Sequence, residues 1–183
     1  ILTNNFENMV DGQARYSLMC NENGGVVDDL IVYKKGENDY FIVVNAANRE
    51  KDFNWMVQHK FGDVEFTNVS DDYAQIALQG PKDMDIIRKL TSEENIPQKY
   101  YHAVFNATVD GIPCIVSKTG YTGEDGVELY LDSSKAEEMW DKLLAAGKEE
   151  GLIPCGLGAS DTLRMEAAMT LYGNGMDEEF TPL

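Results

Sequence analysis

The chain has 183 residues, of which 32 are acidic and 15 are basic, so its formal net charge at pH 7 is −17. Binding to nucleic acid or to anionic lipid needs clustered Lys and Arg, and this charge balance excludes both as expected partners. Hydrophobic residues make up 43% of the chain, which is enough for a packed core. The longest mostly apolar stretch, residues 40–47, falls far short of the roughly 20 residues of a membrane-spanning helix, so we expect no membrane partner.

The first predicted structure is a hairpin. The turn residues Asn23-Gly24-Gly25 precede a strand over residues 26–33 that is rich in β-branched side chains. A short turn over residues 36–39 leads into a second strand over residues 40–45. Two strands joined by so short a turn pair in the antiparallel direction.

Helix and strand signals then alternate. Asn48 is a good N-cap for a helix whose apolar residues recur at helical spacing, namely Phe53, Met56, Val57 and Phe61. Residues 64–69 and 75–79 are expected to be strands. Pro81 stands at the tolerated first position of a second helix, whose expected buried side chains are Met84, Ile87 and Leu90.

The second half of the chain predicts another hairpin, from residues 101–109 and 112–118, followed by a strand over residues 127–131. Ser134 and Glu137 match a capping box at the start of a helix. That helix carries one apolar stripe, made of Ala136, Met139, Trp140, Leu143 and Leu144.

A last helix is expected to begin at Ser160 or Asp161. The order of elements predicts an α+β fold in which antiparallel sheets are flanked by helices. The Gly80-Pro81 corner is the expected boundary between a first subdomain, residues 1–80, and a second, residues 81–183.

Metal and redox chemistry have little support in the sequence. The cysteines Cys20, Cys114 and Cys155 are widely spaced and form no C-x-x-C pair, and His59 and His102 stand at no ligand spacing. We therefore expect no metal. Unpaired cysteines are typical of a reducing compartment, so a cytoplasmic location is expected.

Residues 119–129 contain three glycines at three-residue spacing. A phosphate cradle is disfavoured, because the segment has no G-K-[ST] and Glu124-Asp125 would repel a phosphate. One interpretation is a structural loop between strands. The other is that Glu128, near Tyr121, pairs with a planar group that offers two parallel N–H donors, as Arg or the amino-pyrimidine edge of a pterin does.

Asp28-Asp29 is the second candidate. Adjacent strand residues point to opposite faces, so one carboxylate faces the covered side of the sheet and the other faces away. One interpretation is a solvated acid beside a structural hydrogen bond. The other is a buried acid that orients an amine or stabilises a developing iminium cation.

Several segments together resemble the glycine cleavage system T protein family, whose members are aminomethyltransferases. They are residues 12–17, 20–33, 44–52, Gln79-Gly80-Pro81, Thr119-Gly120-Tyr121-Thr122-Gly123-Glu124, Leu171-Tyr172-Gly173 and Met176-Asp177-Glu178. The resemblance spans essentially the whole chain. It implies ferredoxin-like subdomains of a folate-binding region, without the family's C-terminal barrel domain. Because the chain runs from Ile1 to Leu183, we expect an internal fragment lacking both ends of a family member.

The resemblance also implies a reaction. The one-carbon unit of an aminomethyl group, carried on the lipoyl arm of the H protein, passes to tetrahydrofolate, and ammonia is released. Tetrahydrofolate is then a co-substrate, the lipoylated H protein is the partner, and no metal is required. By the same resemblance, Asp28 matches the catalytic aspartate and Glu128 the glutamate at the pterin edge. Further substrate-binding positions are Tyr16, Tyr33, Asn45 and Tyr121.

One position departs from the family pattern. Ser160 stands where members usually have an arginine, expected near the glutamate carboxylates of the folate, and serine makes no bidentate clamp. Arg164 lies one helical turn further on. A non-catalytic folate-binding or scaffold relative, or a fragment that is inactive on its own, therefore stays open as an alternative. A demethylating folate enzyme fused to a flavin domain is a further alternative within the same fold family.

Overall fold

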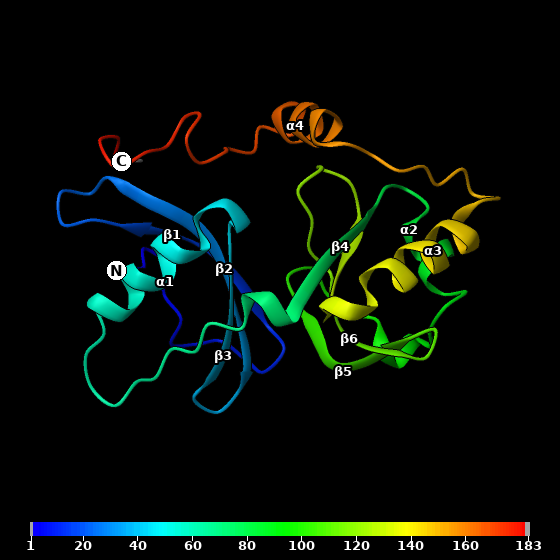
Figure 1. Ribbon diagram of the computed structural model, residues 1–183, viewed down its shortest axis with the longest axis horizontal. Helices are drawn as coiled ribbons and strands as arrows, with labels where there is room; N and C mark the ends of the chain where they lie inside the picture. The colour runs from blue at the N-terminus through cyan, green and yellow to red at the C-terminus, as the bar shows by residue number, and fades with distance from the viewer. Residues whose placement is uncertain (1, 182–183) are drawn as a thin grey trace. The chain divides into compact units, whose positions relative to one another are not determined.

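The structure, a computed structural model, describes residues 2–181 (Figure 1). The chain divides into two compact units. The first contains the residues up to Ser70 together with those from Thr170 onward, and the second is Asp71–Met169. The division differs from the expected boundary at Gly80-Pro81, because the strand that ends at Gln79 pairs inside the second unit.

The first unit contains a three-stranded antiparallel sheet in the order β1-β2-β3 (Figure 1). Its strands are β1 (Ala14–Cys20), β2 (Val26–Gly36) and β3 (Asp39–Val44). The predicted hairpin of β2 and β3 is confirmed. Strand β1 was not expected from the sequence. It pairs along the other edge of β2 and places Met19 opposite Asp28.

Helix α1 (Arg49–Gln58) covers the core of this sheet. It begins directly after Asn48, as predicted, but the Asn48 side chain makes no capping hydrogen bond. Met56 packs in the core with Leu30 and Val32 of β2. Phe61 lies beyond the end of the helix and is 90% exposed, so the predicted apolar face is shorter than expected.

The strand predicted over residues 64–69 does not form. These residues pair with neither sheet, and β-branched side chains alone do not hold a strand without a hydrogen-bonded neighbour. Short 3-10 turns join the regular elements, namely η1 (Ala46–Asn48), η2 (Ser70–Asp72), η3 (Glu93–Asn95) and η4 (Ser133–Lys135).

The second unit contains a four-stranded sheet in the order β4-β7-β6-β5, in which every neighbouring pair is antiparallel. Its strands are β4 (Tyr73–Gln79), β5 (Ala103–Val109), β6 (Ile112–Ser117) and β7 (Gly126–Asp132). Helices α2 (Asp83–Ile87) and α3 (Ala136–Gly147) pack on one face of the sheet. Alternate residues of β7 point into that core, as Val127, Leu129 and Leu131 do.

The predicted α+β class, with antiparallel sheets and flanking helices, is confirmed. The sheet of the second unit and the helices packed on it follow the order β4, α2, β5, β6, β7, α3. A ferredoxin-like subdomain has the order βαββαβ. The unit departs from that order, because three strands follow α2 in succession.

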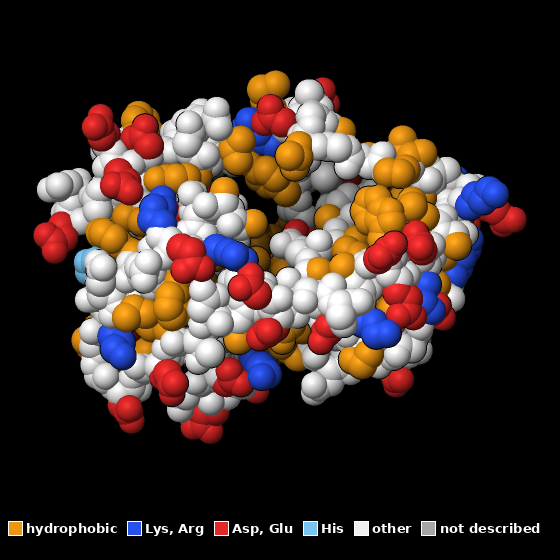
Figure 2. Space-filling model, in the orientation of Figure 1, with side chains coloured by type: hydrophobic (Ala, Val, Ile, Leu, Met, Phe, Trp, Pro, Cys, Tyr) orange, Lys and Arg blue, Asp and Glu red, His pale blue; other side chains and the backbone are white. Residues whose placement is uncertain are grey.

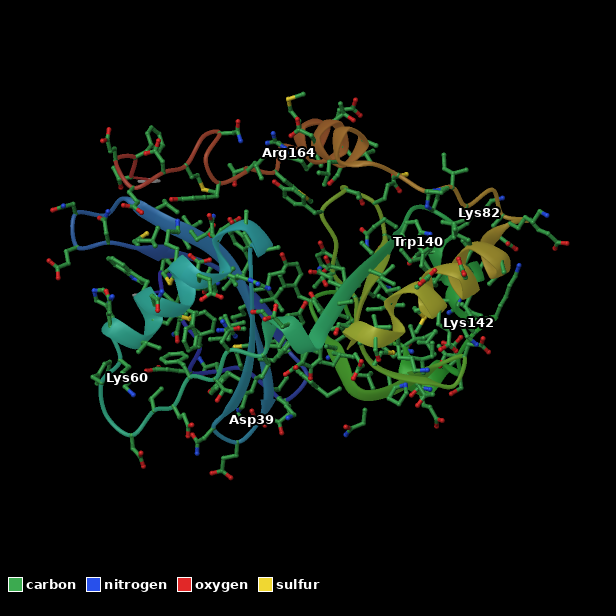
Figure 3. All side chains as sticks on the ribbon, in the orientation of Figure 1. Asp39, Lys60, Lys82, Trp140, Lys142 and Arg164 are labelled. Atoms are coloured by element: carbon green, nitrogen blue, oxygen red, sulfur yellow. The ribbon has the colours of Figure 1, made fainter. Side chains whose placement is uncertain are left out.

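Helix starts in the second unit differ from the expected ones. The side chain of Asp132 accepts hydrogen bonds from the backbone N–H and the hydroxyl of Ser134, so the predicted capping box does not form. Helix α4 (Leu157–Glu166) begins before the predicted Ser160, and none of its residues is buried (Arg164 is labelled on it in Figure 3).

Acidic side chains are spread over the face seen in Figure 2, with Lys and Arg among them. This distribution agrees with the net charge of −17. Within residues 2–181, no helix combines the length and the apolar character needed to cross a bilayer.

The glycine turn before β2 is packed against the C-terminal segment. The Val26 N–H donates to the Asp177 carbonyl at 2.8 Å, and the Asn21 amide donates to the Glu178 carbonyl at 3.0 Å. A Cβ atom on Gly25 would overlap the Glu178 carbonyl. The segment 176–178 therefore requires glycine at this point of the turn.

Replacing Gly25 by Ala should lower the free energy of unfolding by about 1–3 kcal/mol, because the added methyl group displaces the Glu178 backbone. Chemical denaturation measures the change. Gly36→Ala is the matched control, since a Cβ there meets no described heavy atom within 4 Å. Equal stability of the Gly25 and Gly36 variants would contradict this packing.

Candidate active site

Asp28 lies on the core-facing side of β2. Side chains alternate along a strand, so Asp28 shares its face with Leu30 and Val32, which pack against α1. Asp28 is 0% exposed. A carboxylate in this position is costly unless polar groups compensate the loss of water.

Three donors meet the Asp28 carboxylate. Its Oδ1 accepts from the Asn45 amide at 2.8 Å and from the Asp29 N–H at 2.9 Å, and its Oδ2 accepts from the Asn48 amide at 2.8 Å. Asn45 precedes the single turn that joins β3 to α1, and Asn48 is the last residue of that turn. That connection therefore fixes the orientation of the carboxylate, and it uses the Asn48 side chain that the sequence assigned to a helix cap.

Asp29 points to the other face of β2 and is half-buried. Its Oδ2 accepts from the Tyr16 hydroxyl at 2.9 Å, and its Oδ1 accepts from the Asn45 amide at 2.6 Å. Burial raises the pKa of Asp29, while the hydrogen bonds from Tyr16 and Asn45 lower it. Tyr16 and Asn45 thus both contact the Asp28-Asp29 pair.

Two neighbours on α1, Asp52 and Lys51, complete this cluster, and neither is among the catalytic or substrate-binding residues expected from the sequence. Asp52 is 0% exposed, and burial, together with the adjacent Asp28 carboxyl, raises its pKa to about 8. The Lys51 ammonium donates to the Val27 carbonyl and to the Tyr172 hydroxyl, the latter at 2.9 Å. The sequence does indicate the burial of Asp52, because Asp52 precedes Met56 by one helical turn and therefore lies on the same buried face of the helix.

Tyr33 lies further along β2. It is 0% exposed, and its ring centroid is 6.2 Å from that of Phe41. Tyr33 is therefore fully enclosed, whereas Tyr16 is 38% exposed.

Glu128 occupies the centre of β7 in the second unit, on the face opposite Leu129. It is 8% exposed. Its Oε1 accepts from the Gln75 amide at 2.8 Å, and its Oε2 accepts from the Thr119 hydroxyl and, at 3.4 Å, from the Tyr130 hydroxyl. Burial raises the pKa of Glu128, and these three hydrogen bonds oppose that rise.

The glycine-rich loop before β7 wraps around the side chain of Gln79. The Gln79 amide donates to the carbonyls of Thr119 and Val127 at 3.1 and 3.3 Å. A Cβ atom on Gly120 or on Gly126 would overlap that amide. These two glycines therefore serve the structure of the loop, and half-buried Tyr121 follows directly after the first of them.

Ser160 is half-buried on α4. The Arg164 guanidinium is bound to Asp161 at 2.6 and 2.9 Å and to the Met169 carbonyl at 3.1 Å. These contacts commit Arg164 to its own helix end. Arg164 would have to break these hydrogen bonds in order to take the place of an arginine at position 160.

The two units hold the candidate residues separately. The first unit brings Asp28, Tyr16 and Asn45 together, and the second holds Tyr121 and Glu128. In the part of the chain that the structure describes, no group of three or more His, Cys, Asp or Glu side chains is arranged to hold a metal ion.

Comparison with known proteins identifies the family of the chain. The family model described as "GCVT N-terminal domain" matches residues 1–183. An aminomethyltransferase from Bacillus mycoides (strain KBAB4) is 51% identical over the whole chain, and one from Geobacillus sp. (strain WCH70) is 49% identical. The chain covers 50% of each of these relatives, and so spans about half their length.

A solved structure has the same fold. The crystal structure of glycine cleavage system aminomethyltransferase T from Bartonella henselae is 31% identical and superposes with a TM-score of 0.80. The similarity covers 96% of this chain and 46% of that protein. A family match over the full chain, supported by relatives of about half identity, assigns the chain: it belongs to the GCVT N-terminal domain family, the family of the glycine cleavage T protein.

Proposed function

We propose that this chain is the catalytic and folate-binding region of an aminomethyltransferase of the glycine cleavage system. The observation that carries the proposal is the fully buried Asp28 carboxylate, whose two oxygens are held by the amides of Asn45 and Asn48. A fixed buried anion is suited to a reaction in which positive charge develops on an amine.

In the proposed reaction, the aminomethyl carbon leaves the lipoyl sulfur of the H protein and loses its amino group as ammonia. The same carbon forms bonds to two nitrogens of tetrahydrofolate. The two protons lost by those nitrogens balance the thiol and the ammonia. Asp28 acts by orienting the reacting nitrogen and stabilising the cationic intermediate, and it needs no metal to do so.

Glu128 is the proposed anchor of the pterin ring. A carboxylate recognises a planar edge with two parallel N–H donors. Both of its oxygens already accept hydrogen bonds within the unit, from Gln75 and from Thr119. The N–H groups of a bound pterin edge would therefore replace weaker hydrogen-bond donors to Glu128, such as the Tyr130 hydroxyl at 3.4 Å.

The remaining substrate contacts are proposed for Tyr16 and Asn45 beside Asp28, for Tyr33, and for Tyr121 in the glycine-rich loop. The lipoylated H protein is the proposed partner. A cytoplasmic location is part of the same proposal, and the free thiols of Cys20, Cys114 and Cys155 are compatible with it.

A second candidate function is folate binding without transfer. The observation that favours it is Ser160, which offers no charge where the family arginine is expected, while Arg164 is bound to Asp161. Loss of a bidentate clamp weakens the hold on folate carboxylates.

Asp28→Asn in the intact polypeptide that carries this sequence should reduce aminomethyl transfer by at least about 100-fold, because the amide keeps the shape but not the negative charge. Ammonia release from aminomethyl-loaded H protein measures the rate. Asp39→Asn is the matched control, since Asp39 is exposed at the start of β3 (labelled in Figure 3) and should leave the rate unchanged. Transfer at the native rate by a folded Asp28→Asn variant would reject the proposed role.

Ser160→Arg should tighten tetrahydrofolate binding about tenfold, because a charged hydrogen bond to a carboxylate contributes more than 1 kcal/mol. Fluorescence of Trp55 and Trp140 follows the titration. Thr162→Arg is the control, since it adds the same charge to an exposed position of the same helix. Equal affinities of the two variants would argue against a folate clamp at position 160, and binding by the native chain without transfer would favour the second function.

A further inference from the structure

Asp52 and Asp28 meet where α1 packs on β2. Asp52 lies one turn before Met56, and Met56 packs on Leu30 and Val32. The i and i+4 positions of a helix share a face, so Asp52 faces the part of β2 that precedes Leu30. Both aspartates are 0% exposed, and their carboxyl groups lie within hydrogen-bonding reach of each other.

The two carboxyl groups differ in their hydrogen-bond donors. Asp28 receives three donors, from Asp29, Asn45 and Asn48. Neither oxygen of Asp52 receives a hydrogen bond from any residue that the structure describes. An ionised Asp52 would therefore be a buried anion without a donor, next to a second anion, and this is the arrangement that a protein interior tolerates least.

One proton resolves this arrangement. A protonated carboxylic acid is a donor, and a carboxylate has about four acceptor positions, of which Asp28 uses three. We propose that the Asp28–Asp52 pair holds a single proton, carried by Asp52, and that Asp52 is a positioning residue whose hydroxyl donates to Asp28. The pair then carries one negative charge, located on Asp28.

The charged groups around Asp52 act in both directions. The pKa of Asp52 is raised to about 8. Burial is the largest cause, the contact with Asp28 is the second, and the charge of Asp29, the next residue on β2, adds to the rise. Lys51, from the same helix, lowers it. The Lys51 ammonium is directed to the Val27 carbonyl and the Tyr172 hydroxyl, and so it does not replace the proton.

The consequence for catalysis rests on the proposed function. If Asp28 stabilises a cation during transfer, the donor on Asp52 keeps that carboxylate oriented. Ionisation of Asp52 would place a second negative charge beside it. The proton itself is a property of the folded unit and exists whether or not the chain transfers anything.

The test is a pH titration of the intact chain labelled with carbon-13 at its aspartate side-chain carboxyls, followed by NMR. We expect one resonance with a midpoint near pH 8 that is missing in Asp52→Asn. Asp83→Asn, which replaces another buried aspartate whose pKa is raised by burial, is the matched control and should retain that resonance. A midpoint below about pH 6 for the resonance lost in Asp52→Asn would overturn the proposal.

A second variant tests whether Asp28 and Asp52 share one proton, and this test does not depend on the folding of Asp52→Asn. Asp28→Asn removes the neighbouring charge, so the Asp52 midpoint should fall by one pH unit or more. An unchanged midpoint would mean that burial alone protonates Asp52, and it would overturn the pairing. Neither spectrum needs transfer activity, so a failure here is separate from a failure of the proposed reaction.

Stability gives an independent measure. An unfolded Asp52 ionises near pH 4 and a folded one near pH 8, so its contribution to stability is full below pH 4 and falls as the pH rises to 8. Asn has no such titration. The free energy of unfolding of Asp52→Asn, relative to the native chain, should therefore rise between pH 5 and pH 8, whereas a purely structural role predicts a constant difference.

Discussion

The arrangement of the first unit depends on one buried anion. Asp28 takes a place in the face of β2 that Leu30 and Val32 fill with apolar side chains. Burying a carboxylate costs several kcal/mol unless charge-assisted hydrogen bonds compensate. The compensation comes from two asparagines, Asn45 directly before the turn between β3 and α1 and Asn48 as the last residue of that turn. This requirement explains why the turn has two amides and why the helix begins without a side-chain cap.

Glu128 solves the same problem in a different way. Its donors come from side chains of three separate segments, Gln75 on β4, Thr119 in the glycine-rich loop and Tyr130 on β7. The donors of Asp28 are one backbone N–H and two amides fixed by a single turn. Asp28 is therefore held in one geometry. The orientation of Glu128 therefore depends on the packing of three segments and not on one turn.

The elements that the sequence predicted are those with strong local signals. β2, β3 and α3 have β-branched runs or a regular apolar stripe, and these signals need no distant partner. Residues 64–69 have similar β-branched content and form no strand, because strand formation also needs a neighbour that local patterning does not reveal. β1 was not predicted because its own residues carry a weak strand signal. It forms a strand because it pairs along the free edge of β2.

The sequence identified a candidate site residue where the residue type stands out locally, and it missed residues whose surroundings are set by tertiary packing. Asp28 stands out as an acid after a glycine turn, and Asn48 was assigned to a helix cap because Asn is favoured there. The competing demand of a buried carboxylate redirected that side chain. Asp52 was overlooked because a polar residue in an amphipathic helix is normally assumed to face water. Its helical phase with Met56 argues otherwise, and an acid on the buried face of a helix implies a partner before that partner is known.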